Sequence, residues 1–171
     1  MKRDTMIPCS DVPEGLPPVC GKDPRVLILG SFPGIISLEG ARYYGNPQNR
    51  FWRIMGDLFD FDASLPYPQR IEQITAHRVA LWDVIRCCLR EGSADERIRY
   101  PVFNNLDGFL DNHPGIILVA LNGTAAARYF RQACSATGID TVLLPSTSPA
   151  HARASYEEKR EKWKIVKKAA G

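Results

Sequence analysis

The sequence predicts an α/β protein, a three-layer α/β/α sandwich around a four-stranded, mainly parallel sheet. Four short apolar runs recur along the chain, and an uninterrupted apolar run is typical of a strand buried on both faces. Amphipathic segments separate the runs, and the connections are long enough to cross over between parallel strands. The chain has 171 residues, of which 44% are hydrophobic and 24% are charged, so it can bury one sizeable core.

Residues 1–24 precede the first apolar run and predict an irregular N-terminal arm. They hold five prolines and show no helical period. Residues 25–171 are expected to form a single domain. The sequence shows neither a run of about 18 apolar residues nor a signal-peptide pattern, so we expect a cytoplasmic protein without a membrane span.

The first strand is expected at residues 26–29, where the sequence reads VLIL. The run stops at Gly30, and a long loop punctuated by glycine and proline follows. A helix is expected at residues 51–59, because apolar residues recur there at the spacing of a helix that packs on a sheet.

The later elements follow from the same patterns. A turn bracketed by Pro66 and Pro68 leads into a short helix at residues 69–77, and RVALWDV at residues 78–84 predicts the second strand. Residues 85–100 indicate a loop with some helix, and Pro101 is expected to open a helix that continues to Asn112. A third strand at 116–121, a helix at 124–136, a fourth strand at 141–144 and a last helix at 154–169 complete the sandwich.

Four loops are expected to gather at the carboxyl edge of this sheet, where open α/β folds bind their ligands. They span residues 31–49, 83–88, 122–123 and 145–151. Amides and aromatic rings are concentrated there and acids are few, the main residues being Phe32, Tyr43, Tyr44, Asn46, Asn49, Trp52 and Asn122. Carboxamides suit the reading of a base edge, and rings can stack on a base removed from its duplex. The edge therefore favours recognition of a nucleobase or nucleic acid.

Each of these residues also has a structural interpretation, which the sequence leaves open. Asn49 could cap the helix that begins at Phe51, and Trp52 is typical of a core. Asn46 and Asn122 could hold turns.

Several common site patterns are missing from the sequence. GSFPG lacks the spacing and the lysine of a phosphate-binding loop, and neither G-x-G-x-x-G nor G-x-S-x-G occurs. His77, His113 and His151 are dispersed, and only His151 falls at the functional edge. We therefore expect no metal and no cofactor. A net charge of +3 allows a polyanionic partner without requiring one, and the basic residues near the C-terminus alternate with glutamates as on a solvated helix face.

The five cysteines are expected to be reduced, structural thiols. One vicinal pair and three scattered residues match neither a C-x-x-C metal pair nor an even disulfide framework. An iron–sulfur cluster remains an alternative, and it would draw on Cys9, Cys20, Cys87 and Cys134.

Five motifs together resemble the uracil-DNA glycosylase superfamily. They are GSFPG-x-x-SL, YY-x-x-P-x-N-x-FW, LWDV, LNG and LPSTSPA, and they span the chain from Arg25 to Trp163. Within the superfamily the pattern is most similar to the hypoxanthine-DNA (deoxyinosine) glycosylase branch. The fold known for the superfamily is the sandwich expected above.

The resemblance implies roles for particular residues. Asn49 would be catalytic by positioning the attacking water, and the base would lie among Gly30, Ser31, Phe32, Tyr43, Tyr44 and Asn122. Phe32 would stack on the flipped base, and Asn122 would present its carboxamide to the purine edge. Contacts with the DNA backbone would come from Pro145, Ser146, Thr147, Ser148, His151 and Arg153, with the role of His151 open. The implied partner is DNA with deaminated bases, bound by a monomer.

The motifs depart from those of related branches at two positions, and the second departure favours a purine substrate. Mismatch-type relatives have an Asn where this chain has Phe32, and uracil-specific relatives have a His where it has Leu144. Because the motif loops hold no lysine for a Schiff base, the enzyme would be monofunctional. The edge also lacks an obvious pair of carboxylates, so positioning and hydrogen-bond donation would have to suffice. A uracil or mismatch glycosylase and a non-catalytic nucleic-acid-binding protein on the same fold remain alternatives.

Overall fold

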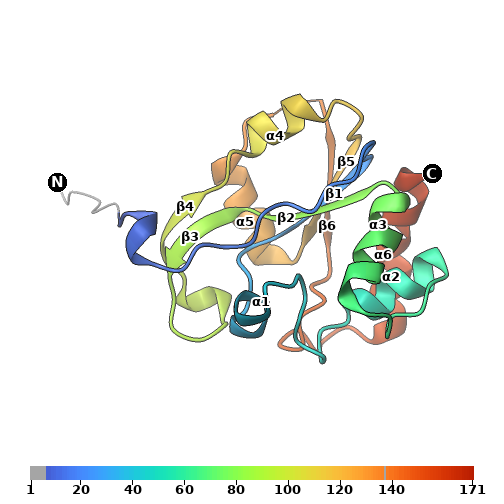
Figure 1. Ribbon diagram of the computed structural model, residues 1–171, viewed down its shortest axis with the longest axis horizontal. Coiled ribbons are helices and arrows are strands. Elements are labelled where there is room, and N and C mark those ends of the chain that lie inside the picture. Colours follow the sequence, from blue (N-terminus) through green and yellow to red (C-terminus); the bar gives the residue numbers. More distant parts are fainter. Residues whose placement is uncertain (1–6, 137) are drawn as a thin grey trace.

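The computed structural model describes residues 7–136 and 138–171 and contains a four-stranded parallel sheet between two layers of helices (Figure 1). The strands are β1 (Val26–Gly30), β2 (Val79–Asp83), β5 (Leu118–Asn122) and β6 (Asp140–Leu144), in the order β2-β1-β5-β6. All three neighbouring pairs are parallel, and the register sets Gly30 beside Asp83. The predicted fold class is confirmed.

Helices cover both faces of the sheet. On one face lie α2 (Phe51–Phe59), α3 (Tyr67–Ala76) and α6 (Tyr156–Ala170), and on the other lie α4 (Leu106–Asn112) and α5 (Thr124–Ala133). Successive residues of β1 alternate between the two cores, Val26 and Ile28 facing the first and Leu27 and Leu29 the second. This two-sided burial explains the continuous apolar runs of β1, β2 and β5, whereas the edge strand β6 is largely exposed.

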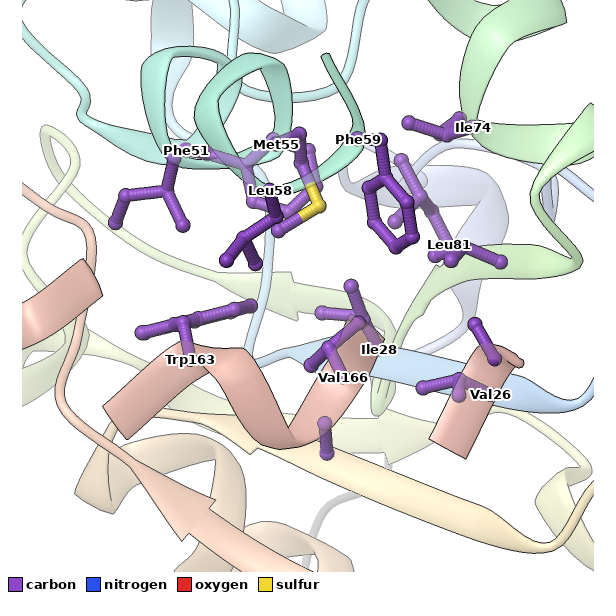
Figure 2. Close-up of a cluster of buried hydrophobic side chains, with 14 of the residues drawn as sticks. Val26, Ile28, Phe51, Met55, Leu58, Phe59, Ile74, Leu81, Trp163 and Val166 are labelled. Carbon is purple, nitrogen blue, oxygen red and sulfur yellow. The ribbon is translucent and has the colours of Figure 1, made fainter. Parts of the chain in front are cut away.

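The first core forms where α2 and α6 close over the sheet. Figure 2 shows Phe51, Met55 and Phe59 of α2 facing Trp163 and Val166 of α6, with the strand residues Val26, Ile28 and Leu81 beside them. The start of α6 is fixed by a capping box. The Ser155 hydroxyl accepts a hydrogen bond from the Glu158 N–H (3.2 Å), and the Glu158 carboxylate accepts one from the Ser155 N–H (2.7 Å).

The segment between β2 and α4 differs from its prediction. It folds as an antiparallel hairpin of β3 (Ile85–Leu89) and β4 (Arg99–Phe103), with the short 3₁₀ turn η2 (Asp95–Arg97) between them. The expected loop with some helix at 85–100 and the expected helix start at Pro101 are therefore wrong. Pro101 is tolerated because the hairpin has only two strands, and each is therefore an edge strand. The helix α4 begins at Leu106. Asn105 caps its start, because the Asn105 side chain accepts a hydrogen bond from the Gly108 N–H (3.0 Å).

Smaller differences concern element ends and one short helix. The long loop after β1 contains α1 (Ile35–Gly40), which the sequence analysis did not anticipate. The helix expected at 69–77 begins at Tyr67, with Pro68 in its first turn. The helix expected to reach residue 136 ends at Ala133.

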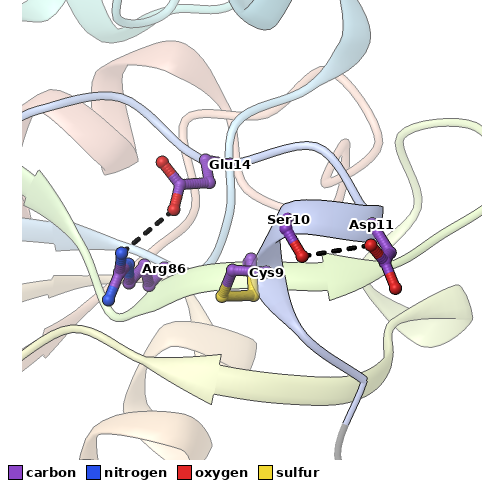
Figure 3. The surroundings of a disulfide bond; sticks show 6 residues. Cys9, Ser10, Asp11, Glu14 and Arg86 are labelled. Atoms are coloured by element: carbon purple, nitrogen blue, oxygen red, sulfur yellow. Dashed lines mark hydrogen bonds and ion pairs between the residues drawn. A yellow bond between two sulfur atoms is a disulfide. The ribbon is translucent and has the colours of Figure 1, made fainter.

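The described part of the N-terminal arm is tied to the hairpin and to β2. A disulfide links Cys9, in the 3₁₀ turn η1 (Cys9–Asp11), to Cys87 in β3, with Cα atoms 5.6 Å apart (Figure 3). Beside it Glu14 pairs with Arg86 at 3.1 Å, and Val19 forms an isolated bridge with Leu81.

The expectation of reduced thiols is therefore wrong for Cys9 and Cys87. Within the described residues Cys20, Cys88 and Cys134 are free. The disulfide takes two of the four cysteines that the iron–sulfur alternative required.

Among residues 7–136 and 138–171, no helix combines the length and the apolar character that crossing a membrane would require.

Candidate active site

A cavity of about 340 Å³ opens at the carboxyl edge of the sheet, where β1, β2 and β5 end. It brings together all the residues that the sequence analysis assigned to the water or the base, namely Gly30, Ser31, Phe32, Tyr43, Tyr44, Asn49 and Asn122. Five residues of the loop after β6 join them, and three of these, Ser146, Thr147 and Ser148, were expected to contact the DNA backbone. Pro145, His151 and Arg153 do not line this cavity. They border a second hollow of about 310 Å³, together with Lys159 and Lys162.

Asn49 lies half-buried at the cavity, just before α2 begins. Its Oδ1 accepts a hydrogen bond from the Phe51 N–H at 2.9 Å, so the structural interpretation of this residue also applies. The bond fixes the carboxamide, and its NH₂ group has no hydrogen-bond partner in the described part of the chain. The following residue, Arg50, donates its N–H to the Thr147 carbonyl (3.0 Å), which joins this loop to the loop after β6.

The Asn122 side chain is held by two neighbours at the end of β5. Its NH₂ group donates to the Thr147 hydroxyl (3.0 Å) and to the Tyr44 hydroxyl (3.2 Å), while its Oδ1 accepts from the Thr147 N–H (3.0 Å). Asn122 and Thr147 are both buried. Both N–H bonds of the amide are therefore used within the protein, and one lone pair of Oδ1 remains.

The aromatic rings of the cavity are fixed by different contacts. The Arg90 guanidinium lies over the Phe32 ring, 5.0 Å from its centroid. Tyr44 stacks on Phe51 with centroids 3.9 Å apart, and its φ of 53° is a left-handed conformation that costs energy for a residue with a side chain. The Tyr43 hydroxyl donates to the Pro17 carbonyl (2.7 Å), so this ring also anchors the N-terminal arm.

Two carboxyl groups line the cavity, so the expected lack of an acid pair is wrong. Asp83, at the end of β2, is only 5% exposed, and Asp95 comes from the turn of the hairpin. Asp95 Oδ1 accepts a hydrogen bond from the Ser31 hydroxyl (2.6 Å). Asp83 lies against Gly30, where an added Cβ would come within 2.5 Å of its Oδ1, so the close approach requires glycine.

Burial sets the protonation of these acids. Desolvation, reinforced by the charge of Asp95 and opposed by that of Arg90, raises the pKa of Asp83 to about 7. Burial also raises the pKa of Asp95, against the hydrogen bond from Ser31. At neutral pH the cavity therefore holds a carboxyl group that is substantially protonated and can act as a hydrogen-bond donor.

The position of one of these acids could have been predicted from the sequence. Asp83 ends a predicted buried strand within LWDV, at the edge where the other site residues were placed. Asp95 gave no such signal, because its position depends on the hairpin.

The chain matches known proteins over nearly its whole length. The family model described as the uracil DNA glycosylase superfamily matches residues 17–170. A hypoxanthine DNA glycosylase of Methanosarcina barkeri is 35% identical over 151 residues, which are 88% of this chain and 94% of that protein. A second protein of that name, from Methanosarcina acetivorans, is 33% identical and covers 91% of this chain and 98% of its own.

A solved structure has the same fold. It is the solution NMR structure of a Methanosarcina acetivorans protein named as a candidate uracil DNA glycosylase, with a TM-score of 0.80 and 32% sequence identity. The match covers 93% of this chain and 98% of that one.

Proposed function

Because this chain belongs to the uracil DNA glycosylase superfamily, we propose that it is a monofunctional DNA glycosylase that releases hypoxanthine from deoxyinosine in DNA. Two relatives named hypoxanthine DNA glycosylase support the substrate, and each is matched over more than nine-tenths of its length. The observation that carries the proposal is the cavity itself, which joins Phe32, Asn49 and Asn122 at one edge of the sheet. Its volume is within the range of small-molecule sites, about 300–1,000 Å³.

The reaction replaces the bond between the sugar and the purine with a bond to water. As the bond breaks, positive charge develops on the sugar and negative charge on the departing base. Asn49 would hold the water beneath the anomeric carbon, using the amide group that its bond to Phe51 leaves available. Phe32, supported from behind by Arg90, would stack on the extruded base.

Contacts to the DNA backbone would come from the surface beside the cavity. The loop after β6 follows the cavity wall with Ser146, Thr147 and Ser148, and then reaches the hollow bordered by Arg153 and Lys159. The Lys159 ammonium donates to the His151 carbonyl (2.6 Å), so it fixes this loop as well as adding positive charge. Because Thr147 is fully buried and its N–H donates to Asn122, the phosphate contacts are expected mainly from the two serines and Arg153.

The proposal is tested by base release. Duplexes that each carry one deoxyinosine, uracil or xanthine are incubated with the protein and then treated with alkali, which cuts the strand at an abasic site. Cleavage of the inosine strand at a higher rate than the uracil strand is expected. Faster cleavage at uracil would favour the uracil or mismatch glycosylase, and tight binding without any cleavage would indicate a non-catalytic binding protein. Light scattering of the free protein tests the expected monomer.

A further inference from the structure

Asp83 is a buried acid that none of the roles described so far requires. Its side chain is 5% exposed and lines the cavity, yet its Oδ2 has no hydrogen-bond partner among the described residues. A buried oxygen without a partner is costly, and most structures avoid it. Because this oxygen is enclosed and has no donor to stabilise a negative charge, its surroundings favour the protonated, uncharged carboxyl group.

The hairpin between β3 and β4 brings a second acid to the same cavity. Asp95 is held there by the Ser31 hydroxyl, directly after β1. The negative charge of Asp95 disfavours ionisation of Asp83, in addition to the larger effect of burial. Asp83 is the more buried of the two, and it lacks the stabilising donor that Asp95 has in Ser31. The proton therefore belongs mainly on Asp83.

The other charged or titratable groups around Asp83 do not remove this preference. Arg90, after β3, opposes the protonation of Asp83, but it also faces Asp95. Tyr43 and Tyr44, from the loop after β1, are neutral at physiological pH because burial raises the pKa of both hydroxyls. The pKa of Asp95 is in turn raised by the charge of Glu96 and lowered by that of His151.

We propose that Asp83 is the catalytic acid that assists departure of the base, and that Asp95 is the positioning residue that keeps it protonated. This inference rests on the proposed glycosylase function. The bond between C1′ and N9 breaks, and its electron pair leaves with the purine. Asp83 gives its proton to an acceptor atom of the purine, while the water oxygen bonds to C1′. One water proton then returns to the Asp83 carboxylate, so the enzyme ends in its starting state and the net reaction is the addition of water.

This assignment accounts for features that the amide-based mechanism leaves unexplained. Both N–H bonds of Asn122 are already donated to Thr147 and Tyr44, so Asn122 has no donor left for a departing base. Leu144 offers no donor either. A protonated carboxyl group can both donate a hydrogen bond and transfer its proton, and of the two cavity acids Asp83 is the more buried and the one without a hydrogen-bond donor.

The experiment measures single-turnover excision of hypoxanthine from a deoxyinosine duplex, with enzyme in saturating excess, between pH 5.5 and 9. The wild-type rate is expected to fall as the pH rises through about 7, where Asp83 loses its proton. Asp83→Asn should lower the rate at pH 6 by about 100-fold or more, and should flatten the profile. Asp95→Asn removes a like charge while keeping the acceptor for Ser31, so the falling limb should move to lower pH.

Asp111→Asn, an exposed substitution on α4, is the matched control and should leave rate and profile unchanged. A folded Asp83→Asn protein with the wild-type rate and profile would overturn the inference, as would an Asp95→Asn profile with an unmoved midpoint. If Asp83→Asn does not fold, the shift in Asp95→Asn decides. A wild-type protein that releases no base contradicts the proposed function instead, so the two failures are distinguishable.

Discussion

At the scale of single residues, the buried carboxyl of Asp83 makes stability depend on pH in an unusual direction. Its pKa is about 7 in the folded protein and near its ordinary value in the unfolded chain, so the folded state binds the proton more tightly. The stabilising effect is complete below about pH 4 and is lost as the pH rises through 7. The loss amounts to roughly 4 kcal/mol of unfolding free energy for a shift of about three pKa units.

Asp83→Asn should therefore raise the free energy of unfolding at pH 8 relative to wild type, and should change it little at pH 4. Urea unfolding at both pH values measures the difference. Asp111→Asn serves as the control, because it makes the same chemical change at an exposed position of α4. Equal stability of Asp83→Asn and wild type at pH 8 would mean that the Asp83 carboxyl ionises without penalty.

Asn49 combines a structural and a proposed catalytic role, and substitutions can separate them. Asn49→Ala should abolish excision, and should also lower stability by about 1 kcal/mol because the Phe51 N–H loses its acceptor. The control is Asn105→Ala, which removes a comparable side-chain bond at the start of α4 and is expected to cost similar stability with full activity. Thermal melting and the inosine assay are run on both variants. Normal excision by Asn49→Ala would leave this residue with the structural role alone.

The sequence predicts the positions of site residues that lie next to a recognisable strand or helix, but not their hydrogen-bond partners. Phe32 follows the first predicted strand, Asn122 follows the third, and Asn49 precedes a predicted helix. Because the sheet is parallel, these positions converge on one edge. Hydrophobic periodicity does not predict which group each side chain hydrogen-bonds to. The commitment of Asn122 to Thr147 and Tyr44 depends on loop conformations, and so does the lack of a partner for Asp83.

At the scale of elements, the hairpin between β2 and α4 shows where sequence patterns become ambiguous. The segment IRCCL is too short and too mixed in polarity to distinguish a strand from a loop, and Pro101 is common at helix starts. The decisive contacts are nonlocal, because β3 is covered by the N-terminal arm through Gly15 N–H and the Cys9–Cys87 disulfide. The strands β1, β2 and β5 of the main sheet required no such information, because their apolar runs are continuous.

The disulfide predicts that reduction weakens the attachment of the arm. The linked cysteines are 78 residues apart. A cross-link over such a loop lowers the entropy of the unfolded chain, and so raises the free energy of unfolding by about 2–4 kcal/mol. Dithiothreitol should therefore lower the unfolding midpoint of the wild-type protein and have no effect on Cys9→Ser. Cys134→Ser, which removes a free thiol, should keep the response. Identical wild-type midpoints with and without dithiothreitol would mean that the bond does not stabilise the fold.

At the scale of the whole molecule, the net charge is small for a protein that is proposed to bind DNA, a polyanion. The net charge is only +3, so attraction to DNA depends on where the basic groups lie. A third hollow, of about 550 Å³, is bordered by Arg50, His151 and Lys159 and adjoins the loop that lines the cavity. The cavity and the basic hollows therefore share one edge of the molecule, which suits a protein that would hold the DNA backbone beside the proposed base site.

Arg153 tests this arrangement through the salt dependence of binding. Each phosphate contact contributes about one unit to the slope of log affinity against log salt concentration, so Arg153→Ala should weaken binding at low salt and reduce the slope by about one. Binding is measured by fluorescence anisotropy in an Asn49→Ala background, so that the inosine duplex remains intact. Arg131→Ala removes an exposed arginine from α5, on the opposite face of the sheet, and should leave the slope unchanged. Equal slopes for the two arginine variants would place the DNA on a surface other than the one around the cavity.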